Sequence, residues 1–319
     1  MQANAQFIGI DVAKAELVIG CAGQVSTLAN EPAEIERWVR SVPAGSVLAV
    51  EASGGFEQAL LGAAHTAGLR CYLLNPADVR HYARAVGLRS KTDRVDALVL
   101  ARYVQAEHAH LHPWQRPAAL QRELDVLLKR RAMLVKTRQQ VRLALADQHD
   151  LLRSAKALLA QYAKLLGAVE RQIRDKIGLL SGGAAQLRLL RSIPGIGWLN
   201  AAYLTNLFNR IAFVRSDSLV AFAGLDPRAC DSGTMRGRRR LSKRGPALMR
   251  QLLYNAAMAA ARSETFQSMK QALAARGLPI TAIYNIIARK LLRIAWAVFK
   301  TQSPFDPAKV GPAGPAQPT

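Results

Sequence analysis

Four acidic residues in the first third of the chain have the types and the spacing of a metal site. Asp11 ends one apolar, strand-like run and Glu51 ends another, while Asp93 and Asp96 lie three residues apart in KTDRVDALVLARY. Residues three apart on a helix project from one face, so Asp93 and Asp96 would lie side by side. Carboxylate oxygens are the ligands that magnesium prefers, and magnesium keeps waters that substrate phosphates can replace.

A strand Asp, a second strand's Glu and a DxxD pair on a helix form the set that a ribonuclease-H-like fold places around its metal ions. Two such ions about 4 Å apart can stabilise both the attacking and the leaving oxygen of a phosphoryl transfer. Four carboxylates in near-contact repel one another strongly unless a cation is bound between them. The sequence therefore predicts a Mg2+ site for phosphoryl transfer built from Asp11, Glu51, Asp93 and Asp96.

Each of these acids also has an ordinary structural explanation when it is taken alone. Asp11 could end its strand with a turn, and Asp93 could be a helix N-cap. The other two could be solvated surface acids. The order of the four, each after an apolar strand or at a helix start, favours the metal site. Two further acids, Asp78 and Glu57, are the most easily mistaken for ligands.

A second candidate site is a serine directly before a basic segment in the last third of the chain. Ser232 and Gly233 precede a stretch in which six of the nine residues from 236 to 244 are Arg or Lys. Interleaved glycines would let this stretch approach a phosphate backbone, and its cations could stabilise a serine alkoxide and a pentacoordinate phosphorus. The predicted nucleic-acid-binding residues are Arg236, Arg238, Arg239, Arg240, Lys243 and Arg244.

Other interpretations of this serine stay open. Ser-Gly in a turn is commonly only a turn, and a serine is a weak nucleophile without a base or a strong positive field. No histidine lies nearby in the sequence, so a Ser-His-Asp hydrolase is poorly supported. Ser242 and Tyr254 are alternative nucleophiles that sequence chemistry alone does not rank.

A third feature, RSIPGIGWLNAAYL (191–204), has the pattern of a helix-hairpin-helix turn. In such a turn Gly195 and Gly197 would leave backbone N–H groups at a helix N-terminus free to bind a phosphate without reading bases. We therefore predict that these two glycines bind nucleic acid, with a plain helix–helix turn as the alternative.

The charge of the chain lies almost entirely on one side of Gln115. The 319 residues carry a formal net charge of +22, yet residues 1–115 hold 10 basic and 11 acidic side chains, and residues 116–319 hold 34 and 11. Such a skewed field indicates a polyanion partner rather than solubility alone. Because the basic residues are spread along this whole part and not along one amphipathic stripe, nucleic acid is favoured over an anionic membrane.

Alternating strands and helices must position the four acids. The strand-like runs are residues 6–11, 15–21, 47–51 and 70–74. The helical patterns between and after them are residues 31–40, 56–67 and 93–106. This alternation predicts an α/β domain within residues 1–115.

Residues 116–180 are predicted to form a helical arm. Gly and Pro are almost absent after residue 118, and Leu, Arg, Lys, Gln and Ala dominate. Apolar residues follow 3–4–7 spacing, but Arg131 and Arg138 fall on two seam positions, so the heptad is imperfect. A weaker pattern around 147–154 favours two antiparallel helices, as a helical hairpin or coiled-coil arm. A basic helix packed on its own domain is the alternative.

The remainder is predicted to be mostly helical over 181–303, followed by a disordered Pro-, Ala- and Gly-rich tail over 304–319. No apolar run reaches the roughly 18 residues of a membrane span, and the N-terminus lacks a signal-peptide pattern. The three cysteines have no CxxC spacing, which argues against a disulfide framework or a zinc site. We expect a cytoplasmic protein.

Taken together, these motifs resemble the DEDD-type transposases of the insertion-sequence one-ten family, including its eleven-eleven subgroup, which are bridge-RNA-guided DNA recombinases. The resemblance spans nearly the whole chain. Its motifs are, in order, FIGIDVAK, VEASGGF, NPADVRHYARAVGLRSKTDRVDALVLARY, SIPGIGWLNAA, FAGLDP, DSG and LSKRG. Each motif is weak alone, but their order and spacing together are highly specific.

The resemblance implies a RuvC-like, ribonuclease-H-like N-terminal domain, a coiled-coil arm, and a mostly helical transposase domain. It implies that the four acids bind magnesium and that Ser232 attacks DNA to form a covalent phosphoserine link. The implied partners are donor and target DNA and a structured noncoding bridge RNA. Further copies of the chain, in a dimer or tetramer, would form a composite active site with acids and serine from different protomers.

Two functions other than a site-specific DNA recombinase are also compatible with the sequence. A RuvC-like junction nuclease would use metal-activated water and no covalent serine. A non-catalytic nucleic-acid scaffold would keep the basic segment, but it would have no use for clustered carboxylates facing a phosphate backbone.

Overall fold

The computed structural model describes residues 5–88, 92–228 and 240–310. The chain divides into two compact units, Met1–Arg116 and Pro117–Thr319. This division falls one residue after the predicted end of the α/β domain, at the point where the charge of the sequence changes. The predicted arm lies in the second unit.

The first unit is built on a mixed five-stranded sheet in the order β3-β2-β1-β4-β5. β1, β2 and β3 form an antiparallel meander, while β4 runs parallel to its two neighbours, β1 and β5. The strands are β1 Phe7–Val12, β2 Glu16–Cys21, β3 Gln24–Ala29, β4 Val47–Glu51 and β5 Arg70–Leu74.

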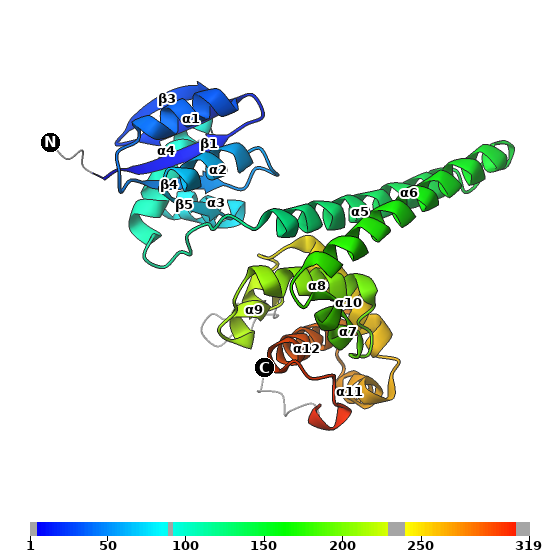
Figure 1. Ribbon diagram of the computed structural model, residues 1–319. Helices are drawn as coiled ribbons and strands as arrows, with labels where there is room; N and C mark the ends of the chain where they lie inside the picture. Colours follow the sequence, from blue (N-terminus) through cyan, green and yellow to red (C-terminus); the bar gives the residue numbers. More distant parts are fainter. Residues whose placement is uncertain (1–4, 89–91, 229–239, 311–319) are drawn as a thin grey trace. The chain divides into compact units, whose positions relative to one another are not determined.

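Helices cover both faces of this sheet (Figure 1). They are α1 Pro32–Ser41, α2 Gln58–Thr66, α3 Pro76–Ala85 and α4 Asp93–Glu107. Because successive strand residues point to opposite faces, Ile8 and Ile10 pack with α1 and α2, whereas Val47 and Ala49 pack with α3 and α4. Three antiparallel strands followed by two parallel ones, in this order, make a ribonuclease-H-like fold, so the predicted fold class is confirmed.

A long helical hairpin opens the second unit (Figure 1). Helix α5 spans Ala119–Ala144 and helix α6 spans Leu152–Leu179, with a short 3-10 turn at His149–Leu151 between them. Lys176, near the end of α6, forms an ion pair with Glu123, near the start of α5. The two helices therefore run antiparallel, as the weakened pattern around residue 150 indicates.

One of the two arginines that interrupt the heptad of the arm, Arg131, forms an ion pair with the other helix. Arg131 Nη2 lies 2.8 Å from Glu170 Oε1 on α6, and both side chains are about one-fifth exposed. Glu170 also lies 3.8 Å from Arg174. The seam position that interrupts the apolar pattern is thus filled by an ion pair between the two helices.

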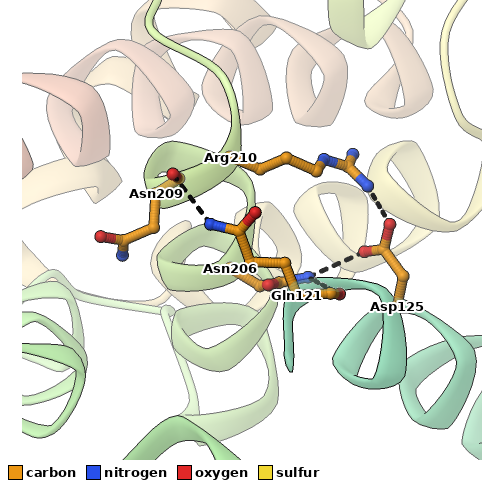
Figure 2. A network of polar contacts seen from close by, with 5 residues as sticks. All are labelled: Gln121, Asp125, Asn206, Asn209 and Arg210. Carbon is orange, nitrogen blue, oxygen red and sulfur yellow. Dashed lines mark hydrogen bonds and ion pairs between the residues drawn. The ribbon is translucent and has the colours of Figure 1, made fainter. Parts of the chain in front are cut away.

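A partly buried polar network, here called the arm-base network, joins the base of the arm to helix α8. Its members are Gln121 and Asp125 on α5 and Asn206, Asn209 and Arg210 on α8, Trp198–Arg210 (Figure 2). Asn206 Nδ2 donates a hydrogen bond to Asp125 Oδ1 at 2.8 Å, and Asp125 forms an ion pair with Arg210. Burial lowers the pKa of Arg210. Because partly buried charges need partners, this network fixes how α5 sits on α8.

The rest of the second unit is a helical bundle with a small ribbon. Its helices are α7 Gly183–Arg191, α8, α9 Ser216–Ala223, α10 Ala247–Ala260, α11 Glu264–Ala275 and α12 Ile280–Thr301. Two-residue strands, β6 Pro227–Arg228 and β7 Arg240–Leu241, pair antiparallel. Within the described ranges, none of the helices combines the length and the apolar character that crossing a lipid bilayer requires.

The segment 304–310 differs from the predicted disordered tail. It contains a 3-10 turn at Pro307–Lys309, and Phe305 and Val310 pack against the helical core. Phe305 N also donates to Ser192 Oγ at 2.8 Å. The Pro-, Ala- and Gly-rich composition predicts disorder and gives no sign that these two side chains pack against the core. The remaining residues of the predicted tail, 311–319, lie outside the described residues.

Candidate active site

Three of the four predicted acids lie together beside the end of β1. Asp11 is in β1, and Asp93 and Asp96 are in the first turn of α4. One carboxylate oxygen of each can be chosen so that all three atoms lie within 4.8 Å of one another. Asp11 and Asp96 are half-buried and Asp93 is exposed, so the group is accessible from solvent.

Two strand glycines let α4 lie close enough to the sheet to bring these acids together. A Cβ on Gly9 would lie 2.0 Å from the carbonyl oxygen of Ala97 and 2.3 Å from the backbone nitrogen of Ala101. A Cβ on Gly20, in the adjacent strand, would lie 2.8 Å from the carbonyl carbon of Ala97. The helix backbone therefore rests directly on β1 and β2, where only a hydrogen atom fits.

The acids lie at similar distances from this contact along the strand and along the helix. Asp11 lies two residues beyond Gly9 on the same face of β1, which is about 6.6 Å along the strand. Asp93 lies four residues before Ala97, which is about 6.0 Å along the helix. Both steps lead to the same end of the sheet, so the carboxylates of the two elements meet there.

The N-cap of α4 is Thr92, so the alternative explanation of Asp93 as the N-cap is wrong. Thr92 Oγ1 accepts a hydrogen bond from Val95 N at 3.3 Å, and the Thr92 carbonyl accepts one from Asp96 N at 2.9 Å. The cap fixes the first turn of the helix, and acidic residues there are favoured by the helix dipole. The carboxylate of Asp93 is thus not used for capping.

Glu51 stands on the neighbouring strand and lies outside the group of three. The parallel pairing of β1 and β4 ends with Ile10 opposite Val50, so the next residues, Asp11 and Glu51, are neighbours where the two strands end. Glu51 is half-buried. Asp78, in the first turn of α3, is not part of the group either.

The group has the chemistry of a divalent-cation site. Carboxylate oxygens are hard ligands suited to Mg2+ and similar ions. Three carboxylates in one place repel one another, and a bound cation relieves that repulsion. With Glu51 at the end of the adjacent strand, these residues fit a divalent cation held where a phosphodiester can reach it.

Only part of the predicted basic segment can be placed. Four predicted residues lie outside the described part of the chain: Ser232, Arg236, Arg238 and Arg239. Arg240, Lys243 and Arg244 are described, and all three are exposed. Exposed cations are suited to binding a phosphate backbone.

The two alternative nucleophiles both have side-chain contacts. The Ser242 hydroxyl donates to the carboxylate of Asp226. The Tyr254 ring packs edge-on against Tyr284, with 5.6 Å between the ring centroids. Neither observation ranks them against Ser232.

Close backbone packing fixes the residues that flank β6 and β7. A Cβ on Gly224 would lie 2.7 Å from the backbone nitrogen of Gly245, and a Cβ on Gly245 would lie 2.5 Å from the carbonyl carbon of Ala223. Arg250 donates to the carbonyls of Ala223, at 3.3 Å, and Gly245. The residues just before β6 and just after β7 are therefore closely packed against each other.

The two glycines of the PGIG turn have different surroundings. Gly195 has a φ of 83°, and a Cβ there would lie 2.3 Å from the carbonyl oxygen of Ala256 and 2.7 Å from the nitrogen of Ala260. Its small size therefore lets the turn pack on α10. Gly197 is exposed at the N-cap of α8, with nothing within 4 Å of its Cβ position. Phosphate binding at this turn stays a prediction.

Two family models match most of the chain. A transposase model of the DEDD, IS110 type matches residues 8–155, which contain all four acids. The model of the transposase IS116/IS110/IS902 family matches residues 187–273, which contain the PGIG turn and Ser232. The chain belongs to this family of transposases. It is therefore an enzyme that cuts and rejoins DNA.

Relatives match this transposase over almost its whole length. The pilin gene-inverting protein of Moraxella lacunata is 28% identical and covers 94% of this chain and 97% of its own. The transposase for insertion sequence element IS1111A of Coxiella burnetii is 26% identical, with 94% and 91% covered. A solved structure of T. thermophilus RuvC in complex with a Holliday junction substrate is 19% identical, with a TM-score of 0.27, and covers 35% of this chain and 100% of its own.

The sequence predicts the three acids that the structure groups together, but the predictions do not include the glycines that let their elements approach. Gly9 and Gly20 interrupt apolar strands, and a glycine inside a strand is a mark of close backbone approach that could have revealed them. Glu57 is buried, whereas an acid next to two glycines is normally expected to be a solvated loop residue. The sequence carries no comparable signal for it.

Proposed function

We propose that this transposase cuts and rejoins DNA with a magnesium-dependent acidic site and a serine nucleophile. The observation that carries the proposal is the meeting of Asp11, Asp93 and Asp96 within 4.8 Å in a member of this transposase family. These acids and Glu51 would hold Mg2+, which supplies positive charge at the scissile phosphate when it is bound.

Ser232 is the proposed nucleophile. Its hydroxyl oxygen bonds to a backbone phosphorus while the bond from that phosphorus to a deoxyribose oxygen breaks, and the serine proton ends on the departing deoxyribose hydroxyl. Attack by a deoxyribose hydroxyl of another strand reverses these changes, so rejoining requires no further energy source. Exposed Arg240, Lys243 and Arg244 would hold neighbouring phosphates.

The proposed partners are donor and target DNA and a structured noncoding RNA that pairs with both. The net charge of +22, carried by the residues beyond the first unit, supports polyanion binding in general. The resemblance to RNA-guided recombinases supports the RNA in particular. A dimer or tetramer in the cytoplasm would bring the acids of one copy to the serine of another.

A covalent-trapping assay tests the serine step. The protein, its element-end RNA and labelled donor and target DNA are incubated with Mg2+, denatured, and separated on a gel. We expect protein-linked DNA with the wild type, none with Ser232→Ala, and retained linkage with the control Ser242→Ala. Linked DNA in Ser232→Ala would refute Ser232 as the nucleophile.

The second candidate function is a junction nuclease that uses metal-activated water. The acid group favours it as the alternative, because this chemistry needs no residue outside the first unit. Cleavage without linked product, unchanged by Ser232→Ala, would establish this alternative and leave Ser232 as a turn residue.

Asp11→Asn tests whether the acids are catalytic. Asparagine keeps the shape of the side chain but removes the negative charge that attracts a cation. We expect cleavage and covalent trapping to be lost while DNA binding, measured by gel shift, is retained. Full activity in Asp11→Asn would instead favour a non-catalytic or differently built site.

A further inference from the structure

Glu57 is a buried acid, six residues after Glu51, that none of the proposed chemical steps uses. It is 5% exposed and follows the loop 52–56, which connects β4 to α2. Its Oε2 accepts hydrogen bonds from Ser53 N at 3.2 Å, Ser53 Oγ at 2.7 Å and Gly55 N at 2.9 Å. Its Oε1 accepts one from Gln58 Nε2 at 3.1 Å.

Both oxygens of this carboxylate are therefore occupied by donors of the chain itself. Burial alone raises the pKa of Glu57, but hydrogen bonds from the Ser53 hydroxyl, from Gln58 and from backbone N–H groups outweigh it and lower the pKa below its ordinary value. Four hydrogen bonds from the chain favour the ionised form of this carboxylate, with three donors on Oε2 and one on Oε1. Binding a cation would compete with the bonds that hold the loop.

Other hydrogen bonds fix the two ends of the same loop. Ala52 N donates to the carbonyl of Leu74 in β5 at 3.1 Å. At the other end, Asn30 Nδ2 donates to the carbonyl oxygens of Phe56, at 3.3 Å, and of Ala13, at 2.8 Å. Asn30 thereby links this loop to the turn that follows β1.

The middle of the loop is held mainly by the buried carboxylate, beside one backbone hydrogen bond from Gln58 N to the carbonyl of Gly55 at 3.3 Å. Gly54 and Gly55 have φ values of 81° and 126°, in the left-handed region that favours glycine. Glycines lose much backbone freedom when they are ordered, so the Ser-Gly-Gly stretch needs hydrogen bonds to hold one conformation. Glu57 supplies three of them through one oxygen.

We propose that Glu57 is a positioning residue for the acidic site, which fixes the loop 52–56 and, through it, the end of β4 and the carboxylate of Glu51. The inference rests on the proposed function, because it takes Glu51 as one of the acids that hold the cation. Glu57 touches neither cation nor DNA and acts through the backbone of the loop.

Two substitutions separate hydrogen bonding from charge. Glu57→Gln is nearly isosteric: its amide oxygen can accept the bonds from Ser53 and Gly55, and its amide nitrogen would face Gln58, whose own amide can turn to present oxygen. Glu57→Ala removes every acceptor. Val39→Ala trims a buried side chain of α1, which packs on the same face of the sheet as α2 and away from α4, and controls for a general loss of stability on that face.

The full chain is studied by Mn2+ titration and, without metal, by hydrogen exchange of its amides. We expect Glu57→Ala to raise the Kd for Mn2+ by about 10–100-fold, as loss of a group that orients a metal ligand does, with Glu57→Gln and Val39→Ala within about threefold of wild type. The amides of Ser53 and Gly55 should lose protection in Glu57→Ala and keep it in the other two variants.

Three results would overturn the positioning role. Equal loss of Mn2+ affinity in Glu57→Gln and Glu57→Ala would make Glu57 a ligand. Wild-type Mn2+ affinity in a less stable Glu57→Ala would reduce it to a general structural role. Unchanged amide protection in Glu57→Ala would show that the loop does not depend on it. If Glu57→Ala does not fold, Ser53→Ala is used instead, because it removes one of the four hydrogen bonds and should raise the Kd by a smaller factor. Ser53→Thr keeps the hydroxyl and should bring the Kd back to the wild-type value.

Failure of the metal site itself gives a different pattern. If the wild type and Asp11→Asn bind Mn2+ equally weakly, the proposed function fails, whatever the amides of the loop show.

Discussion

At the scale of single residues, the backbone of α4 touches β1 where Gly9 has no side chain. Gly9→Ala would place a methyl group 2.0 Å from the Ala97 carbonyl oxygen and 2.3 Å from the Ala101 nitrogen, and backbone atoms cannot turn aside. We expect α4 to move away from the sheet, with a loss of about 1–3 kcal/mol of unfolding free energy or more. Urea unfolding measures this loss. Mn2+ titration should show weaker binding, because Asp93 and Asp11 separate.

Gly62→Ala is the matched control for this substitution. Gly62 lies in α2, has no atom within 4 Å of its Cβ position and has an ordinary helical backbone. Alanine there should leave Mn2+ binding unchanged and add up to about 1 kcal/mol of stability, since alanine favours helix over glycine. Equal behaviour of the two alanine variants would contradict the close approach at Gly9.

Which residues of the site can be predicted depends on what each residue does. Asp11, Asp93 and Asp96 are predictable because a carboxylate type at a strand end or a helix start already indicates metal chemistry. Glu57 is not, since its role depends on donors from a folded loop. Thr92 shows the same limit: by residue type and position Asp93 could be the N-cap, and only the hydrogen-bond geometry assigns the cap to Thr92.

At the scale of elements, the arm is held on α8 by the arm-base network. Asp125→Ala would leave Arg210 partly buried without its ion pair and remove one of the two acceptors of Asn206 Nδ2, the other being the Gln121 carbonyl. We expect a loss of about 1–3 kcal/mol, typical of hydrogen bonds to charged groups. Thermal unfolding would measure it, and hydrogen exchange should show reduced protection at the start of α5.

Asp175→Ala controls for the change of charge in that experiment. Asp175 is an exposed acid on α6, the other helix of the arm. Exposed single charges contribute little, so its removal should change stability by less than about 0.5 kcal/mol. A similar effect of the two alanine variants would mean that the network does not hold the arm.

The sequence predicts the apolar elements and misses two polar ones. Four of the five strands of the sheet are found because they are runs of Val, Ile and Leu. β3, QVSTLA, is missed because it is an edge strand whose side chains are mostly exposed. α3 is missed because it buries a single residue, Val79, and so shows no apolar pattern. Both depend on a neighbouring element more than on their own pattern.

At the scale of the whole molecule, the net charge of +22 makes nucleic-acid binding dependent on salt. If the chain contacts six to ten phosphates, DNA affinity should fall by about 10³–10⁵ between roughly 50 and 200 mM salt, since bound counterions are released on binding. Fluorescence anisotropy with labelled duplex at several salt concentrations gives the slope of log affinity against log salt.

Replacing Arg240 and Lys243 by glutamine should reduce that slope by about one for each phosphate that the protein no longer neutralises. Arg37→Gln, an exposed change in the near-neutral first unit, is the control and should leave the slope unchanged. A slope that is the same in all three proteins would remove these two residues from the DNA-binding surface.

The arm has a length that can be expressed in base pairs. Its helices contain 26 and 28 residues, which at 1.5 Å per residue gives about 40 Å. Duplex DNA rises about 3.4 Å per base pair, so the arm spans about 12 base pairs, slightly more than one turn of the double helix. A duplex bound at both the tip and the base of the arm would therefore show two protected patches in a hydroxyl-radical footprint, about one turn apart and on the same side of the DNA.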